Sequence, residues 1–474
     1  MSVSKYIAID LGAESGRAIV GLIENNNIRI EEVYRFPNKQ INIQGHLHWD
    51  VLSLFDEIKN GIRSAVKKGH VDIKSVGIDT WGVDFGFITK QNELIGFPYC
   101  YRDTRTNGIM EKVFEIIPKE KIYSATGIQF WQFNSLFQLA KYIDEDSELI
   151  KIADKLLFMP DIFNFLLTGL KTTEYTIAST SQLLNAINKN WDHSLLNKLH
   201  FPSSLFNKII PSGTIIGKLK ADIAAETGIN DIDVIAPGCH DTASAVAAIP
   251  LKDKNSAFIS SGTWSIIGIE SDEPVINEDT YRLNFTNEGG VGGKIRFTSN
   301  MMGMWLLQQL RKSWKKKNEE ISYEEMSLIA KESESNRTII DPDDQVFYNP
   351  DDMQEAINNY CFKNDLKLPE TKAQYIRCVL DSLAQKYSMM ISNIEALANH
   401  KIKQLHIVGG GSQNNLLNQL TANACKIPVI AGPVEATALG NIIVQAMALG
   451  NLSSVEEGRN IIENSFMLSK FNPR

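Results

Sequence analysis

Short apolar runs separated by small polar residues mark the first forty positions of the chain. Residues 6–9 are apolar and are followed by Asp10. Residues 12–16 are rich in small side chains, and residues 18–23 are apolar again. This alternation predicts two strands joined by a tight turn, which is the pattern of a β-hairpin. Residues 28–36 continue the pattern, and we expect a third strand there.

The spacing of apolar residues changes after position 50. Leu54, Ile58 and Ile62 recur every fourth residue, so residues 51–66 are predicted to form a helix. Residues 76–82 then have the composition of a buried strand that ends in a polar turn containing glycine. Strands that alternate with helices in this way indicate an α/β domain.

The second half of the chain repeats the pattern of the first. Residues 257–260 and 264–269 are predicted strands, and residues 261–263 between them form a turn of small polar side chains. A long helix is expected over residues 372–399, and a strand over residues 404–408, which three glycines follow. The repeat predicts a second α/β domain.

The boundary between the two domains is expected where a helix-like run ends and the second hairpin is about to begin. We therefore assign residues 1–246 to an N-terminal domain and residues 247–474 to a C-terminal domain. The chain has 474 residues, of which 43% are hydrophobic and 22% charged, so either half is long enough to bury its own core.

Charge and composition narrow the classes of partner. The formal net charge is −8, which argues against nucleic acid or an anionic membrane as the main partner. No apolar stretch is long enough to span a bilayer and no apolar leader precedes Tyr6, so we expect a cytoplasmic protein. The sequence leaves the oligomeric state open between a monomer and a homodimer. The five cysteines lack a C-x-x-C pair and fit reduced thiols, with a Cys361–Cys378 pair as the alternative.

The first turn carries groups that suit a phosphate. Its glycines let backbone N–H groups approach phosphate oxygens, and Ser15 adds a hydroxyl donor. Arg17 adds a positive fork, or it pairs with a carboxylate instead. Asp10 suits a metal ion or its water shell. A plain hairpin turn is the alternative, since the turn has neither of the common Gly-rich nucleotide motifs.

Two further turns add to this interpretation. Residues 261–263 lie at the tip of the second hairpin and include the hydroxyl of Thr263. The glycines at 409–411 follow a strand and have an entropic cost that a flat ligand against bare backbone would justify. Two hairpin tips with small polar residues suit the binding of a triphosphate. The alternative for the glycines at 409–411 is an ordinary turn from a strand to a helix.

Residues 237–245 are the richest in chemical groups. Asp241 follows a glycine turn and opens an alanine-rich helix, where a carboxylate can accept the proton of an attacking hydroxyl in phosphoryl transfer. His240 would hydrogen-bond substrate hydroxyls. The alternative makes Asp241 a helix N-cap and His240 a surface histidine.

A second polar group suits a sugar. Trp81 and Asp84 combine an aromatic face, which packs on sugar C–H groups, with a carboxylate that accepts from hydroxyls. A core tryptophan and a turn aspartate are the alternative. Asn300 and Gln308 lie among methionine and tryptophan residues that are typical of a core, and both are candidates to face a ligand.

These motifs, in this order, resemble the FGGY carbohydrate kinases, which include glycerol kinase, xylulokinase, fuculokinase and rhamnulokinase. The first turn reads D-x-G-x-x-S-G-R, the base motif G-x-x-D lies near mid-chain, and S-S-G-T and G-G-G follow. The resemblance covers roughly residues 5–450. Within the family it is strongest to the kinases of L-rhamnulose, over residues 77–84, 238–246 and 285–290.

The resemblance implies two ribonuclease-H-like domains of the actin-like ATPase type, with a cleft that closes around ATP and sugar. It implies phosphorylation of L-rhamnulose at the 1-hydroxyl, with Asp241 as proton acceptor and Asp10 holding Mg²⁺. Family substrate positions are matched by Gly82, His240, Thr242 and Asn300. Family nucleotide positions are matched by Ala13, Glu14, Ser15, Gly16, Arg17, Thr263, Gln308 and Gly410.

One residue departs from the family pattern. Glu14 stands where the family usually has a small hydroxyl residue, and a carboxylate there would repel phosphates unless it points away or pairs with Arg17. Sister kinases of L-fuculose, D-xylulose or glycerol are alternatives, as is an ATPase of the actin or chaperone kind that has no sugar substrate.

Overall fold

The computed structural model describes residues 3–333 and 338–474, so Met1 and Ser2 of the N-terminal segment lie outside the described residues. The chain forms two compact units. The first contains the residues up to Pro250 together with Glu270–Phe297 and Ala436–Ser465, and the second contains Leu251–Ile269, Thr298–Glu435 and Phe466–Arg474. The first break falls close to the expected boundary, but the units are not the contiguous halves 1–246 and 247–474.

The first unit is built on a six-stranded sheet of order β14-β15-β6-β1-β2-β3. β1 pairs antiparallel with β2 and parallel with β6, β6 pairs parallel with β15, and β15 pairs antiparallel with β14. The predicted hairpin and third strand are confirmed. The strands are β1 (Ser4–Leu11), β2 (Ser15–Glu24), β3 (Asn27–Pro37), β6 (Ile73–Thr80), β14 (Thr214–Lys218) and β15 (Asp233–Ala236).

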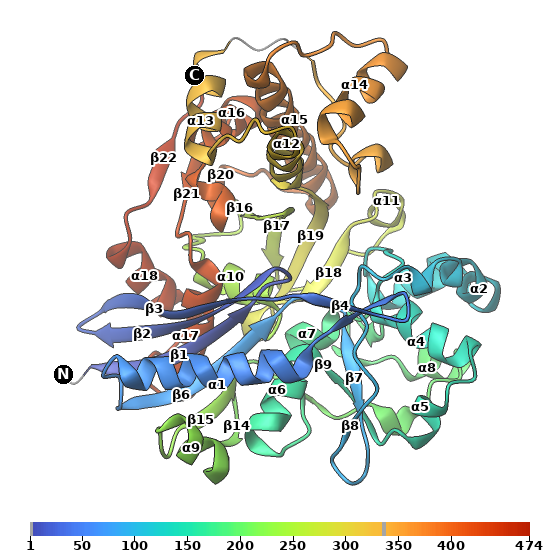
Figure 1. The fold of residues 1–474 in the computed structure, drawn as a ribbon, viewed down its shortest axis with the longest axis vertical. Helices are drawn as coiled ribbons and strands as arrows, with labels where there is room; N and C mark the ends of the chain where they lie inside the picture. Colours follow the sequence, from blue (N-terminus) through green and yellow to red (C-terminus); the bar gives the residue numbers. More distant parts are fainter. Residues whose placement is uncertain (1–2, 334–337) are drawn as a thin grey trace. The chain divides into compact units, whose positions relative to one another are not determined.

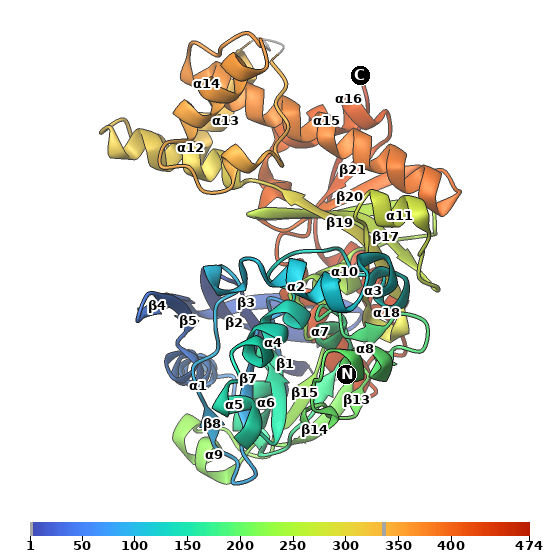
Figure 2. The ribbon, with the colours of Figure 1, turned by 90° about the vertical axis from the view of Figure 1, so that its right-hand side faces the viewer.

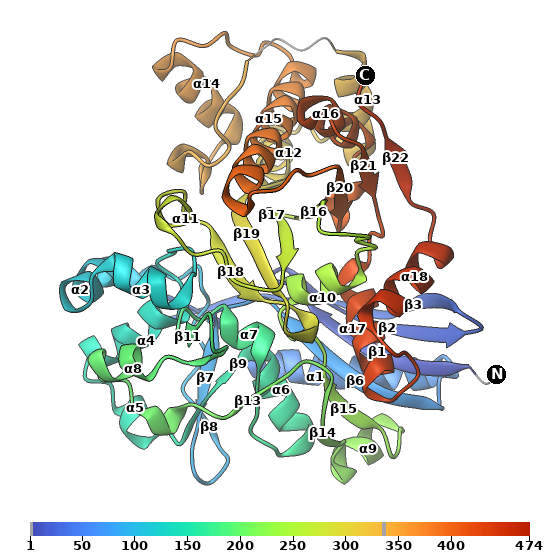
Figure 3. The same ribbon diagram turned by 180° about the vertical axis from the view of Figure 1, so that it is seen from behind.

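Helices cover both faces of this sheet, with α1 (Val51–Lys67) on one side and α17 (Ala436–Ala448) on the other (Figures 1 and 3). α1 is the predicted helix: its apolar residues are buried, and Asp50 caps it by accepting from Ser53 N at 3.0 Å. Further helices of the unit are α6 (Met159–Thr168), α7 (Tyr175–Ser179), α9 (Ala221–Thr227), α10 (Asp241–Ala248), α11 (Glu278–Arg282) and α18 (Val455–Ser465).

Helix α17 explains why a late segment belongs to the first unit. Asn441 donates to Gly77 O at 3.1 Å and Gln445 donates to Ile7 O at 2.9 Å, so both amides bind the backbone of the central strands. Gly440 permits a close crossing with α10, because an added Cβ would lie 1.7 Å from Ser244 O. These contacts join positions more than 190 residues apart, which a linear boundary does not capture.

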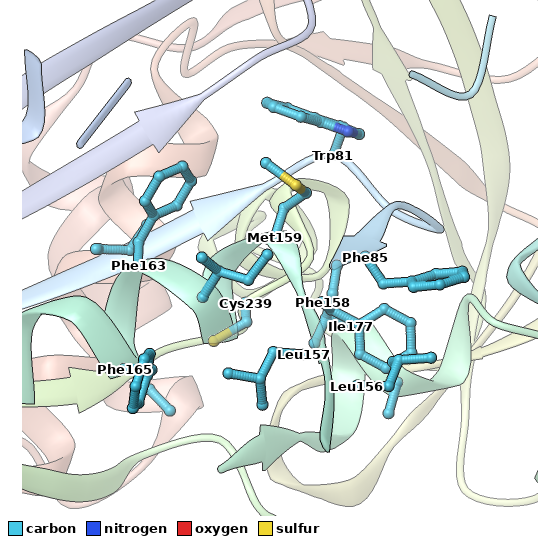
Figure 4. Close-up of a cluster of buried hydrophobic side chains, with 14 of the residues drawn as sticks. Trp81, Phe85, Leu156, Leu157, Phe158, Met159, Phe163, Phe165, Ile177 and Cys239 are labelled. Atoms are coloured by element: carbon cyan, nitrogen blue, oxygen red, sulfur yellow. The ribbon is translucent and has the colours of Figure 1, made fainter. Parts of the chain in front are cut away.

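A smaller layer is inserted after β6. Its three-stranded sheet has the order β8-β7-β9. Figure 4 shows its core, where Trp81 and Cys239 belong to the same cluster of buried apolar side chains. The segment after β6, which contains Trp81, and the segment before α10, which contains Cys239, therefore share one hydrophobic core. The elements are β7 (Phe85–Ile88), β8 (Leu94–Ile95), β9 (Lys155–Phe158), α2 (Ile109–Ile116), α3 (Lys119–Thr126), α4 (Ser135–Asp144), α5 (Glu148–Ile152) and α8 (His193–Lys198).

The second unit repeats the topology of the first. Its strands follow the order β19-β17-β16-β20-β21-β22. β16 pairs antiparallel with β17 and parallel with β20, β20 pairs parallel with β21, and β21 pairs antiparallel with β22. The repeat predicted from sequence is therefore present in strand pairing. The strands are β16 (Ser256–Ser261), β17 (Trp264–Ser271), β19 (Ile295–Met302), β20 (Gln404–Val408), β21 (Val429–Ala431) and β22 (Ser469–Phe471).

The long helix α15 (Lys372–Ala398) is also where the sequence predicts it, and Figure 2 shows it beside β20 and β21. It is fixed to β17 by Tyr387, whose hydroxyl lies 2.7 Å from Ser265 Oγ. All five cysteines are thiols. Within residues 3–333 and 338–474, no helix combines the length and the apolar character that crossing a membrane requires. The other helices are α12 (Trp305–Lys316), α13 (Tyr323–Glu332), α14 (Met353–Lys363) and α16 (Asn415–Cys425).

Candidate active site

Asp10 lies at the centre of the polar groups of the first unit. It stands near the end of β1, in register with Arg17 on β2 and with Asp79 on β6. Arg17 forms an ion pair with the carboxylate of Asp10. Of the two roles that the sequence left open for Arg17, pairing with a carboxylate is the one observed.

Asp79 is a buried carboxylate beside Asp10. Its Oδ2 accepts from Asn441 Nδ2 at 2.6 Å, and its buried Oδ1 has no hydrogen-bond partner among the described residues. Burial, and then the negative charge of Asp10, raise the pKa of Asp79 well above its ordinary value. An orphaned carboxylate oxygen next to a second carboxylate fits a cation, although the described chain holds no ready cluster of three metal-binding side chains.

Asp241 is positioned by the end of β6. Thr80 N donates to Cys239 O at 2.9 Å, and a β-bridge joins Thr80 to His240, so the residue that opens α10 follows directly from the sheet. Asp241 lies in the first turn of α10, and the N-cap position belongs to His240. The N-cap role considered for Asp241 is therefore wrong.

The two carboxylate oxygens of Asp241 differ. Oδ1 accepts from the backbone N–H of Thr242 and from Thr242 Oγ1 at 3.0 Å, and it lies 3.3 Å from His240 Nε2. The hydrogen bonds of the Asp241 carboxylate with the described residues are both made by Oδ1, and the side chain keeps 31% of its surface exposed. Burial of the carboxylate, together with the charge of Asp10, raises its pKa. Oδ2 is thus an open oxygen with an increased affinity for a proton.

His240 is buried, so the alternative of a surface histidine is wrong. Its backbone N donates to Thr176 Oγ1 at 3.1 Å, and its ring lies between Asp241 and a buried pair, Arg296 and Glu288. Sequence reasoning missed Arg296 and gave Glu288 only as part of the matching stretch 285–290. A single arginine in a strand carries no local signal of a contact with position 240.

The predicted sugar-facing group forms a tight network. The rings of Trp81 and Trp49 are in contact, with centroids 4.1 Å apart and planes tilted by 39°. Both indoles donate to Asp84 Oδ2, at 3.0 and 2.6 Å. Tyr101 N donates to the same oxygen at 3.1 Å, and Gln138 Nε2 donates to Oδ1 at 2.8 Å. Burial raises the pKa of Asp84 to about 7.

Both oxygens of Asp84 are therefore occupied, and its side chain is fully buried. In this structure the carboxylate positions the indoles, and a direct contact with a sugar through Asp84 stays a prediction. Gly82 lies next to Trp81, where an added Cβ would lie about 3.0 Å from Thr180 Cγ2. The core alternative for Trp81 agrees with its burial, since only 6% of it is exposed.

The first turn is held from outside the hairpin. Asn38 Nδ2 donates to Gly12 O at 2.9 Å, and Gln40 Nε2 donates to Ala13 O at 3.1 Å. Between the strands, Gly12 N donates to Ser15 O at 2.9 Å. The predicted nucleotide positions 13–17 therefore form an ordered tip, on which Glu14 is exposed.

The second unit brings other predicted residues together. Thr263 lies at the β16–β17 turn, and its Oγ1 is 3.4 Å from Gln308 Oε1 on α12. Two of the glycines after β20 are required by the local structure. Gly409 has φ +80°, and both Gly409 and Gly411 lie so close to Ser261 that an added Cβ would clash. An added Cβ on Gly410 meets nothing within 4 Å, so packing does not require that glycine. Asn300 lies half-buried on β19.

Comparison with known proteins places the chain in a family. Residues 5–248 match the N-terminal domain, and residues 257–449 the C-terminal domain, of the FGGY family of carbohydrate kinases. The rhamnulokinase of Bacteroides thetaiotaomicron is 45% identical over 99% of this chain and 96% of its own length. The rhamnulokinase of Oceanobacillus iheyensis is 42% identical over 98% of this chain and 97% of its own.

Solved structures agree on the fold. Gluconate kinase from Lactobacillus acidophilus matches with a TM-score of 0.82 at 18% identity, covering 100% of this chain and 94% of its own. Plasmodium falciparum glycerol kinase with ADP matches with a TM-score of 0.80 at 16% identity, with the same coverage. The expected α/β class, with two ribonuclease-H-like units of the actin-like ATPase type, is confirmed. The chain belongs to the FGGY family of carbohydrate kinases.

Proposed function

We propose that this chain transfers the γ-phosphoryl group of ATP to the 1-hydroxyl of L-rhamnulose, giving L-rhamnulose 1-phosphate and ADP. The observation that carries the proposal is the asymmetry of Asp241. The backbone N–H and the hydroxyl of Thr242 donate to Oδ1, whereas Oδ2 has no hydrogen bond from the described residues, and the pKa of the carboxyl group is raised. The name that its relatives of 40–45% identity share, rhamnulokinase, supports this sugar as the substrate.

In the proposed reaction, Asp241 Oδ2 accepts the proton of the 1-hydroxyl as the oxygen attacks phosphorus. Gly82, Trp81, His240, Thr242 and Asn300 are the proposed substrate contacts, and the indole of Trp81 offers an apolar face for the sugar ring. Asp84 acts on the sugar through the indoles that it orients.

The nucleotide contacts are proposed from both units. In the first unit they are Ala13, Glu14, Ser15, Gly16 and Arg17, and in the second they are Thr263, Gln308 and Gly410. Asp10 would hold Mg²⁺, with Asp79 beside it; when bound, the ion neutralises negative charge on the phosphate oxygens. Because Arg17 pairs with Asp10, it would also limit the net charge that this carboxylate presents to ATP.

The test is ADP release by the purified chain with MgATP, first without sugar and then with L-rhamnulose, L-fuculose, D-xylulose or glycerol. Stimulation by L-rhamnulose well above the other three is the expected result. Stimulation by another sugar would keep the kinase and overturn the substrate. A steady rate that no sugar changes would support an ATPase of the actin or chaperone kind instead.

A further inference from the structure

A fully buried arginine contacts the ring of His240. Arg296 Nη2 lies 2.8 Å from His240 Nδ1 and 2.9 Å from Glu288 Oε2, while Nε donates to Gly289 O at 2.9 Å. No part of Arg296 is exposed to solvent. The guanidinium is therefore held by a carboxylate and a carbonyl, and its contact with the ring has a fixed direction.

Glu288 keeps its charge in this environment. Burial acts to raise its pKa, but the positive charge of the adjacent Arg296, the largest opposing effect, helps to lower the pKa to about 2. Arg296 and Glu288 thus form a charged pair at neutral pH. The pair leaves the guanidinium protonated, with N–H groups and no acceptor.

The direction of the Arg296–His240 contact decides which ring nitrogen carries the proton. A guanidinium only donates, so His240 Nδ1 must accept and cannot carry a hydrogen on the same side. Glu288 Oε2 is the other acceptor near Nδ1, but it lies 3.4 Å away, whereas Arg296 Nη2, which can only donate, lies 2.8 Å away. The neutral ring then has its proton on Nε2, which lies 3.3 Å from Asp241 Oδ1.

We propose that Arg296 and Glu288 are positioning residues that hold His240 in the Nε2–H tautomer, so that its N–H supports Oδ1 of the carboxylate that accepts the substrate proton. The kinetic part of this proposal rests on the proposed function of Asp241, whereas the tautomer does not. With Oδ1 bonded to Thr242 and next to the N–H of His240, Oδ2 is the oxygen left to receive the proton. Loss of the tautomer would replace a donor by an acceptor beside Oδ1.

A purely structural role for the Arg296–Glu288 ion pair explains its arrangement around His240 less well. Buried Arg296 Nη1 has no hydrogen-bond partner among the described residues, so the pair is not arranged for full satisfaction of its donors. Replacement of such pairs by apolar side chains is often neutral or stabilising. An incompletely satisfied arginine that still points one N–H at the histidine beside Asp241 fits a positioning role.

The tautomer is tested directly on the intact wild-type protein by ¹⁵N NMR of histidine-labelled chain. The His240 signals are assigned by their loss in His240→Gln, among the eight histidines of the sequence. We expect Nδ1 in the unprotonated range and Nε2 bonded to hydrogen. A proton on Nδ1 of neutral His240 would overturn the proposal, whatever the sugar assays show.

The kinetic test uses Arg296→Lys and Glu288→Gln, measured with the sugar that stimulates ADP release. Arg296→Lys is expected to lower kcat about 10- to 100-fold, the scale seen when the partner that orients a functional histidine is removed, with the KM for ATP little changed. The matched control is Arg459→Lys. Arg459 is also buried, pairs with Glu270 at 2.7 Å and donates to Val246 O and Ala247 O at the other end of α10.

A merely structural role predicts that the two lysine variants lose thermal stability and activity in parallel. The positioning role predicts that Arg296→Lys alone lowers kcat at equal stability. A wild-type kcat in a folded Arg296→Lys variant would contradict it. If no sugar stimulates the wild type, the function of Asp241 fails, and the NMR result still decides the tautomer.

Discussion

Glu174 is a fully buried carboxylate whose ionisation we expect to weaken the fold. It precedes α7, and its Oε2 accepts from Thr176 N at 2.8 Å, Thr176 Oγ1 at 2.6 Å, Ile177 N at 3.1 Å and Cys239 N at 3.3 Å. Its buried Oε1 has no partner among the described residues. Burial raises its pKa from 4.5 to about 7, although the four donors act in the other direction.

The raised pKa of Glu174 determines whether its contribution to the stability of the fold rises or falls with pH. The folded state holds the proton more tightly than the unfolded chain, so the contribution of Glu174 to stability is greatest below pH 4.5 and falls as the pH rises to about 7. A rise of this size corresponds to about 3 kcal/mol, since one pKa unit is about 1.4 kcal/mol. Above pH 7 the carboxylate is charged in both states, and its contribution no longer changes.

The perturbation is Glu174→Gln, which is neutral at every pH and keeps one oxygen for the four donors. Relative to wild type, we expect the variant to gain up to about 3 kcal/mol between pH 5 and pH 8. Burial, and then the charge of Glu174, raise the pKa of Asp161. The variant therefore also removes the repulsion between these two carboxylates at high pH. The measurement is the urea midpoint at both pH values.

Comparison with wild type cancels the titration of other groups. Glu111→Gln, on the exposed side of α2, is the matched control and should show the same difference from wild type at both pH values. If Glu174→Gln also shows no change with pH, the carboxylate is not held in a raised-pKa state, and the reasoning from burial fails.

Three further variants address the base, the nucleotide and the packing. Asp241→Asn should lower kcat about 10²- to 10⁴-fold while ATP binding survives, as followed by ADP release and calorimetric titration; near-normal turnover would remove Asp241 from its role. Thr263→Ala should raise the KM for ATP more than the KM for sugar, and the reverse order would mean that the nucleotide is misplaced. Gly440→Ala should destabilise the chain by about 1–3 kcal/mol, because its Cβ would lie 1.7 Å from Ser244 O; an unchanged Tm would contradict this.

The strands and helices that the sequence predicts correctly are those with a strong local period. Residues 51–66 were expected to be helical and the helix is Val51–Lys67, while the expected strand 404–408 is Gln404–Val408. These elements bury one continuous face or run, so the spacing of apolar residues is sufficient to locate them. The small polar tips between paired strands identify the hairpins for the same reason.

The boundaries of the units could not be read in this way. Helix α17 belongs to the first unit because Asn441 and Gln445 bind the backbone of strands that lie more than 360 positions earlier. An apolar helix near the end of a chain has the same local pattern whichever sheet it packs on. Only the partner amides distinguish the two cases, and their partners are not local.

The candidate site shows the same limit at the level of single side chains. Asp241 was predictable because it opens a helix after a glycine turn. The sugar contact expected of Asp84 stays a prediction, but the sequence did not reveal that both its oxygens accept from indoles, a backbone N–H and an amide. Apart from Trp81, three positions away, these donors lie 17 to 54 positions from Asp84, and such distant partners leave no trace in the sequence around it.

The two units share one pattern of strand pairing but differ in the groups that the pattern presents. At the first hairpin, β1 and β6 bring two carboxylates into register, with an arginine on β2. At the second hairpin the tip offers the hydroxyl of Thr263 and the glycines after β20, with the amide of Gln308 on α12. Carboxylates attract protons and metal ions, whereas hydroxyls, amides and bare backbone accept phosphates without repelling them. The same topology therefore suits metal binding beside the first proposed nucleotide turn and an uncharged nucleotide contact at the second, and the proposed phosphoryl transfer requires both.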